Sequence, residues 1–267
     1  MKKFDLQGTG VALVTPFHKQ GTIDFTSLGR LIDHTIEGGV DYVVCLGTTS
    51  EYPTLSSQEQ LAVVEFTIEK VENRVPVVLG MGGNDTRSLV DKIRQTDMSS
   101  IAAILSVAPY YNKPNQKGLY AHYKAIAEAS NTPIILYNVP GRCGVNMTAE
   151  TTLQLANDFS NIIGIKEASG NMAQCMDILA NKPQGFTVVS GEDALVLPMI
   201  ALGAQGVISV AANAYPNIMS ELVTHSLKSN MKKARAVHEK LLPFSNAIFD
   251  EGNPTGIKAA LEIMGIC

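Results

Sequence analysis

Short apolar runs alternate with amphipathic segments along the whole chain. Eight of these runs are brief, rich in β-branched residues and bounded by Gly or polar residues, which is typical of buried strands. They span residues 10–14, 42–46, 75–79, 102–106, 134–137, 162–166, 187–190 and 206–209. Successive runs are roughly 25–35 residues apart, which fits repeated strand–helix units. The pattern therefore predicts parallel strands, each followed by a helix.

The helix expected after the second strand has recognisable start and core signals. Ser56 and Glu59 have the spacing of a capping box, in which each side chain bonds the other residue's backbone N–H. The apolar residues that repeat at helical spacing, and that are expected to face the core, are Leu61, Val64, Ile68 and Val71.

Eight strand–helix units favour an α/β fold of the (β/α)8 TIM barrel type over an open doubly wound sheet. An open sheet usually carries a GxGxxG turn after its first strand, and here Thr15-Pro16-Phe17 follows instead. Helical stretches at 216–229, 231–248 and 254–264 exceed one barrel helix. We therefore expect a barrel over residues 1–229 and a C-terminal helical appendage over 230–267. Asn253, in a Gly-Asn-Pro sequence, is expected only to form a turn between two helices.

Composition narrows the functional classes. The chain has 267 residues, 45% of them hydrophobic, and a formal charge of -4, which suits a single barrel with a large core. No Lys/Arg block is present, so nucleic acid is not an expected partner. No apolar run approaches the roughly 18 residues that would span a bilayer. The N-terminal residues lack the apolar core of a signal peptide, and a cytoplasmic enzyme is expected.

Metal and redox motifs are not found. The four cysteines are far apart and form no CxxC pair, and the five histidines show neither HxxxH nor HExxH spacing. We expect no metal site and no organic cofactor.

Lys166 is the leading candidate for chemistry, because it ends the sixth predicted strand. The C-terminal ends of barrel strands face the active site. Burial there disfavours the charged amine, whereas an unperturbed pKa near 10.4 would leave only about 0.04% of it neutral at pH 7. A neutral amine can attack a ketone to form a Schiff base. The alternative is a solvated lysine that ends the strand.

Other strand ends carry polar groups that would converge on the same barrel mouth. Thr48 and Thr49 follow the second strand, and Tyr137 ends the fifth, with Arg142 close behind it. Tyr111 follows the fourth strand beside Tyr110. Together they would supply hydroxyls, phenols for proton transfer and a guanidinium for a carboxylate. Each also has a simpler explanation, since threonines cap helices, tyrosines fill cores or interfaces, and the arginine suits an ordinary loop.

Six stretches of the chain, in order, resemble the pyruvate-dependent class I aldolase family that includes dihydrodipicolinate synthases and N-acetylneuraminate lyases. They are GTTSE (47–51), APYYNKP (108–114), YNVPGR (137–142), GIKEASG (164–170), SGED (190–193) and GVISV (206–210). The paired threonines, the PYYNKP segment and the arginine of YNVPGR are similar to the synthase branch.

The resemblance implies a role for each matching residue. Lys166 would form the Schiff base with pyruvate, and Tyr137, Thr48 and Tyr111 would relay protons, with Tyr111 completing the site of a neighbouring subunit. Thr49 would hold the pyruvate carboxylate and Arg142 the carboxylate of L-aspartate-4-semialdehyde. The main chain near Gly191 and Ile208 would line the site. The implied product is 4-hydroxy-tetrahydrodipicolinate, on the route to diaminopimelate and lysine.

The resemblance also implies a homo-oligomer, at least a dimer and by expectation a tetramer. Family members usually continue for some tens of residues beyond the position matching Cys267, so the helical appendage is expected to be incomplete. The family's lysine-feedback site is matched at Asn84 and Tyr110 only. Its other positions are occupied here by Tyr52, Pro53, Ser57, Gln60 and Ser88. Weak or absent inhibition by lysine is expected.

Two other hypotheses compete with the synthase. One is a lyase or aldolase of the same family that acts on N-acetylneuraminate or a 2-keto-3-deoxy sugar acid. The other is a catalytically inactive barrel that binds or regulates. The position of Arg142 and covalent trapping of pyruvate on Lys166 would distinguish them.

Overall fold

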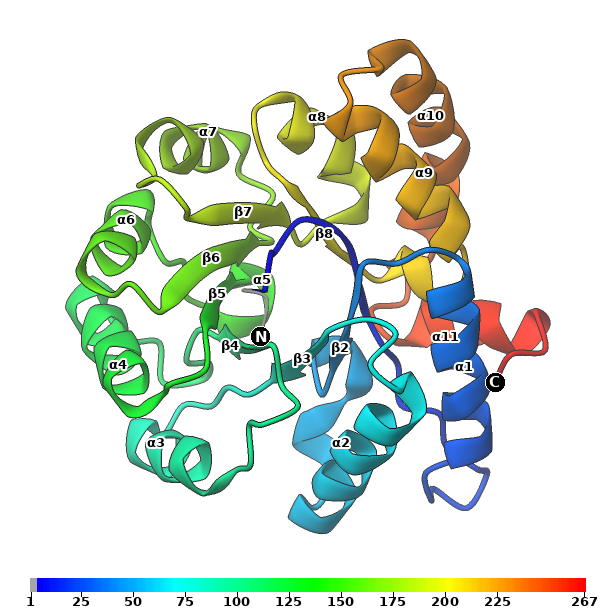
Figure 1. Ribbon diagram of the computed structural model, residues 1–267, viewed down its shortest axis with the longest axis horizontal. Helices are drawn as coiled ribbons and strands as arrows, with labels where there is room; N and C mark the ends of the chain where they lie inside the picture. Colours follow the sequence, from blue (N-terminus) through cyan, green and yellow to red (C-terminus); the bar gives the residue numbers. More distant parts are fainter. Residues whose placement is uncertain (1–3) are drawn as a thin grey trace.

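Eight parallel strands form a closed ring in the computed structural model, which describes residues 4–267 (Figure 1). The strands follow sequence order around the ring, and the last pairs with the first, as Gly10 opposite Ile208 shows. They are β1 (Gly8–Ala12), β2 (Tyr42–Cys45), β3 (Val77–Gly80), β4 (Ala103–Val107), β5 (Ile134–Asn138), β6 (Ile162–Glu167), β7 (Thr187–Ser190) and β8 (Gly206–Ser209). The predicted (β/α)8 TIM barrel is confirmed.

The longer helices surround the ring on its outside, whereas the short helix after β5 lies within the outline of the ring in this view (Figure 1). In chain order the helices are α1 (Phe25–Glu37), α2 (Ser57–Val71), α3 (Thr86–Gln95), α4 (Gln116–Ala129), α5 (Pro140–Cys143), α6 (Ala149–Asp158), α7 (Met172–Asn181), α8 (Val196–Ala201), α9 (Pro216–Leu227), α10 (Met231–Ala247) and α11 (Thr255–Ile263). Short 3₁₀ turns, η1 (Thr48–Ser50), η2 (Tyr52–Thr54), η3 (Asp193–Leu195) and η4 (Ala211–Asn213), follow β2, β7 and β8. Of the helices described, none is both long and apolar enough to cross a bilayer.

All eight predicted strands form, but three begin at other residues than expected, and one of these, β4, starts only one residue late, at Ala103. β1 starts at Gly8, two residues early, because Gly8–Val11 pairs with β8 to close the ring. β3 starts at Val77, two residues late, directly after Pro76. Proline has no N–H to donate to a ladder, so it usually precedes a strand of this kind.

The capping box of α2 is confirmed, but its predicted core face is only partly right. The Ser56 side chain accepts from the Glu59 N–H, and the Glu59 carboxylate accepts from the Ser56 N–H. Val64 and Val71 are buried as expected, whereas Leu61 is 57% exposed. The buried stripe of α2 contains Val63 and Thr67 instead. The helical spacing of Leu61 was correct, but the stripe facing the barrel is rotated away from it.

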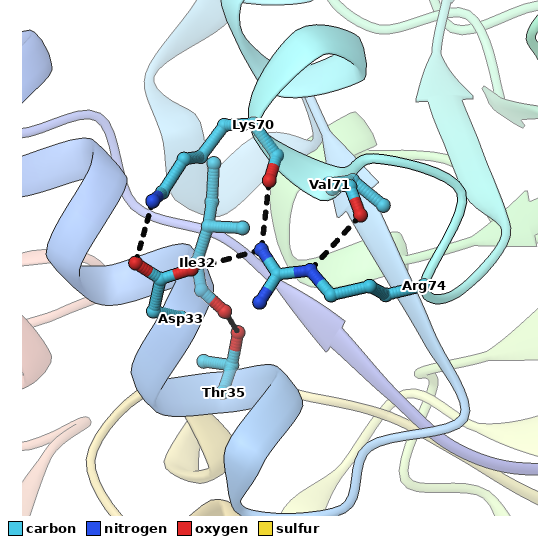
Figure 2. A network of polar contacts seen from close by, with 6 residues as sticks. All are labelled: Ile32, Asp33, Thr35, Lys70, Val71 and Arg74. Atoms are coloured by element: carbon cyan, nitrogen blue, oxygen red, sulfur yellow. Dashed lines mark hydrogen bonds and ion pairs between the residues drawn. The ribbon is translucent and has the colours of Figure 1, made fainter.

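An ion-pair cluster joins α1 to the end of α2 (Figure 2). Asp33 lies 2.6 Å from Lys70 Nζ and 2.8 Å from Arg74 Nη2, and Arg74 also donates to the Lys70 and Val71 carbonyls. Partial burial opposes ionisation of Asp33, but hydrogen bonds from Lys70 and Arg74 hold the pKa of this carboxyl below its usual value. The cluster fixes two neighbouring barrel helices at the side of the ring.

Two helices follow the eighth barrel helix, as the sequence predicted. α10 packs against α9, and α11 contacts the η4 turn that follows β8 (Figure 1, orange and red). Because η4 lies after the C-terminal end of a barrel strand, α11 and the turn before it reach the end of the barrel where active sites form.

Candidate active site

The Lys166 side chain is buried at the C-terminal end of β6, with only 4% of the residue exposed. The β5–β6 register places Tyr137 directly opposite Lys166. The amine Nζ lies 4.4 Å from the centroid of the Tyr137 ring. The alternative of a solvated lysine is therefore wrong. The amine and the phenol of Tyr137 share one site at the end of the barrel predicted for chemistry.

Gly191 keeps space open beside the lysine. It follows β7, and its N–H donates to the Glu167 carbonyl at 2.7 Å. A Cβ at this position would lie 3.0 Å from Lys166 Cε and 2.5 Å from Ala168 Cβ. Any larger residue would push the reactive amine or the backbone aside, so glycine is required by the close approach rather than by an unusual φ angle.

Thr48 and Thr49 lie in η1, the turn that leaves β2. Thr48 and Tyr137 line one small cavity, together with Tyr52 and Gly80. Thr49 is 2% exposed. Gly47 occupies the N-cap of this turn without a side-chain hydrogen bond, so neither threonine acts as its N-cap. Neither threonine therefore has an N-capping role in η1, and Thr48 shares its cavity with Tyr137, the neighbour of Lys166.

Tyr111 is not gathered into this site within one chain. Its side chain is 89% exposed, and its backbone has a φ of +73°, in the left-handed region that side chains seldom adopt. A projecting aromatic ring on a strained loop needs an explanation beyond the single chain.

Arg142 lies in α5, just after β5, where its guanidinium makes a contact that the sequence did not predict. Its Nη2 donates to the main-chain carbonyl of Asn253 at 2.8 Å. The Asn253 side-chain Nδ2 donates to Thr49 Oγ1 at 3.1 Å. The expectation that Asn253 only forms a turn was wrong, because the α10–α11 connection contacts two predicted substrate-binding residues.

Glu192 and Asp193, in the SGED motif, are acidic groups that the sequence analysis left without a role. Burial raises the pKa of the half-buried Glu192 carboxyl, as does neighbouring Asp193, while the positive charges of Lys166 and Arg142 oppose that rise. Burial also raises the pKa of Asp193, although the Val210 and Ala211 N–H groups donate to its Oδ2. Glu192 is therefore an acidic side chain within electrostatic reach of both cations at the mouth.

A buried polar cluster lies on the opposite side of the same strand ends. Glu167, next to Lys166, is 1% exposed, and its carboxylate accepts from Asn138 Nδ2, Ser169 N–H and Gln174 Nε2 at 2.7–3.3 Å. Asn138 in turn donates to Asn146 Oδ1 and accepts from the Met147 N–H. Successive strand residues point to opposite faces. The cluster therefore fixes β5 and β6 from outside while Tyr137 and Lys166 face the site.

The predicted residues thus fall into two groups and two single residues. Lys166, Tyr137 and Gly191 lie together, and Thr48 shares a small cavity with Tyr137. Thr49 and Arg142 are joined through Asn253. Ile208 lies fully buried in β8, opposite Gly10. Tyr111 projects from the surface.

Comparison with known proteins agrees with this geometry. The model of the dihydrodipicolinate synthetase family matches residues 5–267. The chain belongs to this family. A relative from Parabacteroides distasonis named 4-hydroxy-tetrahydrodipicolinate synthase is 49% identical over 265 residues, covering 99% of this chain and 89% of the relative.

Solved structures of family members show the same fold. Dihydrodipicolinate synthase from Aquifex aeolicus is 40% identical, with a TM-score of 0.94 over 98% of this chain and 89% of that one. The chloride-inhibited enzyme from Acinetobacter baumannii, complexed with pyruvate, is also 40% identical, with a TM-score of 0.95 over 98% of this chain and 90% of that one.

Proposed function

We propose that this protein is a 4-hydroxy-tetrahydrodipicolinate synthase, which condenses pyruvate with L-aspartate-4-semialdehyde. The observation that carries the proposal is the buried Lys166 amine, 4.4 Å from the Tyr137 ring at the C-terminal end of a closed barrel. The synthase names of its relatives, together with Arg142 beside the site, favour this reaction over cleavage of N-acetylneuraminate.

The proposed reaction begins at Lys166 Nζ. The amine attacks C2 of pyruvate, water leaves, and a protonated imine forms. The imine withdraws electrons, so the pyruvate methyl group loses a proton and an enamine results. Its carbon attacks the aldehyde carbon of the semialdehyde and forms a C–C bond. The substrate's own amine then attacks C2, closes the ring and releases Lys166.

Each of these steps moves a proton, and we assign its transfer to Tyr137. Its ring lies beside Lys166 and shares a cavity with Thr48. A positioned general acid or base contributes about 10²–10⁴-fold to a rate. We assign the third member of this relay to Tyr111 of the partner subunit, because the ring is 89% exposed on its own chain. The proposal therefore requires at least a dimer, and we extend it to a tetramer of two such dimers.

The two substrate carboxylates are assigned to different residues. Thr49, with its hydroxyl and backbone N–H, would hold the carboxylate of pyruvate. Arg142 would bind the carboxylate of the semialdehyde, since a guanidinium has five N–H donors and, among residues 4–267, only the Asn253 carbonyl occupies one of them. We place the enzyme in the cytoplasm, a reducing compartment that suits its four free cysteines.

Borohydride reduction tests the proposal directly. Wild-type protein incubated with pyruvate and borohydride should gain one covalent adduct per chain on Lys166, read by intact mass and peptide mapping, and Lys166→Ala should gain none. The trapped form should be lost when borohydride is omitted. Condensation should then be observed with L-aspartate-4-semialdehyde and not with N-acetylmannosamine. Absence of an adduct would support the inactive barrel, and activity only with the sugar would support the lyase.

A further inference from the structure

The turn between α10 and α11 contacts the site at two points. Asn253 Nδ2 donates to Thr49 Oγ1 at 3.1 Å, and the Asn253 main-chain oxygen accepts from Arg142 Nη2 at 2.8 Å. These residues are 204 and 111 positions apart from Asn253 in the chain. One residue thus joins the groups assigned above to the two substrate carboxylates.

We propose that Asn253 is a positioning residue for pyruvate, which directs the proton of the Thr49 hydroxyl toward the pyruvate carboxylate. This inference rests on the proposed function. A hydroxyl has one proton to donate and two lone pairs that accept. Because the Asn253 N–H occupies a lone pair of Thr49 Oγ1, the Thr49 proton stays available for an acceptor in the site. A hydrogen bond donated to a carboxylate is among the stronger kinds in proteins.

The surroundings of Asn253 favour this donor role. Thr49 is 2% exposed, so little water competes for its hydroxyl. Asn253 Oδ1 is buried and has no hydrogen-bond partner among residues 4–267. The atom that the amide presents to the threonine is Nδ2, and not Oδ1.

The turn itself is held in place from the barrel side. Lys258, in the first part of α11, pairs with the Glu51 carboxylate, and its Nζ lies 4.4 Å from the centroid of the Phe17 ring. At Gly256 a Cβ would come within 2.4 Å of the Ile248 carbonyl, so the start of α11 lies directly against the end of α10. These contacts anchor the start of α11, directly after the turn that carries Asn253.

Asn253→Asp is the most informative variant because it is nearly isosteric and has only acceptor atoms when ionised. The aspartate would take the Thr49 proton for itself and would repel the pyruvate carboxylate. The KM for pyruvate should rise about tenfold or more, as expected for loss of one hydrogen bond to a charged group. The KM for the semialdehyde should rise by a clearly smaller factor, since the main-chain carbonyl that contacts Arg142 remains and the guanidinium offsets part of the new charge.

The matched control is Lys258→Met, which removes the ion pair to Glu51 and leaves the Asn253 side chain intact. If it loosens the turn, the two KM values should shift together. Pyruvate binding is measured separately by borohydride trapping across a pyruvate titration, without the second substrate. The midpoint of trapping should move upward for Asn253→Asp by the same factor as the KM.

Equal changes in both KM values for Asn253→Asp, matching those of Lys258→Met, would overturn the proposal in favour of a purely structural turn. A pyruvate KM like that of the wild type would overturn it as well. If Asn253→Asp does not fold by circular dichroism, Asn253→Ala decides: pyruvate KM alone should rise a few-fold, and a parallel rise in both overturns the idea. Failure of wild-type trapping would instead reject the proposed function.

Discussion

His122 is expected to make the fold sensitive to mild acid. It lies in α4, 4% exposed, and its Nδ1 is 2.8 Å from Thr86 Oγ1. Its Nε2 is buried without a hydrogen-bond partner in the part of the chain that the structure describes. A proton on that nitrogen would place an unpaired charge in the interior. Burial accordingly lowers the pKa of His122 from 6.5 to about 4.

The direction of the effect follows from proton binding. Between pH 6.5 and about 4 the unfolded state binds a proton at His122 and the folded state does not. The free energy of unfolding therefore rises with pH in this window and falls on acidification. At about 1.4 kcal/mol per pH unit, the loss is about 2 kcal/mol between pH 7 and pH 5 and about 3 kcal/mol by pH 4. For a chain of this size 2 kcal/mol corresponds to a lowering of Tm by about 4–8 °C.

The assay compares Tm at pH 7 and pH 5 for the wild type and for His122→Gln. The glutamine is uncharged at both pH values and can still bond Thr86, so its drop in Tm should be smaller by about 4–8 °C. Carboxyls such as Glu192 titrate in both proteins, and their contribution cancels in this difference. His18→Gln, at a side chain that is 53% exposed, is the matched control and should behave as the wild type. Equal drops in Tm for wild type and His122→Gln would refute the reasoning.

Three further predictions concern the site and its regulation. Tyr111→Phe should lower activity, and mixing this variant with Lys166→Ala should restore part of the activity, because each mixed dimer then contains one site with both the Lys166 amine and the Tyr111 hydroxyl. No recovery of activity after subunit exchange would argue against a shared site. L-Lysine should inhibit weakly or not at all, because the Tyr52 hydroxyl already donates to the Gly82 carbonyl. In addition, the Lys92 ammonium, which donates to Gln60, would repel a second cation. Micromolar inhibition by L-lysine in a titration would contradict this prediction. Glu167→Gln should lower the free energy of unfolding by about 1–2 kcal/mol, since it replaces one charged acceptor by an N–H donor that faces other buried donors. The variant should also reduce kcat more than it changes the KM for pyruvate. A denaturant midpoint unchanged from wild type would rule out a stabilising role for the buried cluster.

The fold was predictable because its signals are local. Apolar runs, their spacing and a capping box are each read within about 15 residues, and all eight strands were found in this way. Errors arose where a distant pairing decides the boundary. β1 extends back to Gly8 because Gly206 pairs there, and nothing near Gly8 in the sequence shows this. Leu61 has the right spacing for the core, but the rotation of α2 on the barrel left it exposed.

The same distinction separates the site residues that sequence found from the one it missed. Lys166 and Tyr137 end predicted strands, and parallel strands in a closed barrel bring such ends together. Asn253 lies in a Gly-Asn-Pro turn, a sequence found in many loops. Its contact with Thr49 depends on how α10 and α11 pack against the barrel, which no local pattern encodes.

Two sets of contacts fix the candidate site: the buried polar cluster behind β5 and β6, and the turn that carries Asn253. The alternation of side chains along the strands explains the first set. Tyr137 and Lys166 face the site, so the next residues along β5 and β6 must face the helices, where a polar side chain needs partners. Asn138 and Glu167 find those partners in each other. A shift of either strand by one residue would place these polar groups in the site and the reactive ones against the helices. The buried cluster therefore opposes the one displacement that would separate amine and phenol, while the Asn253 turn acts on the other side, where the substrates' carboxylates are proposed to bind.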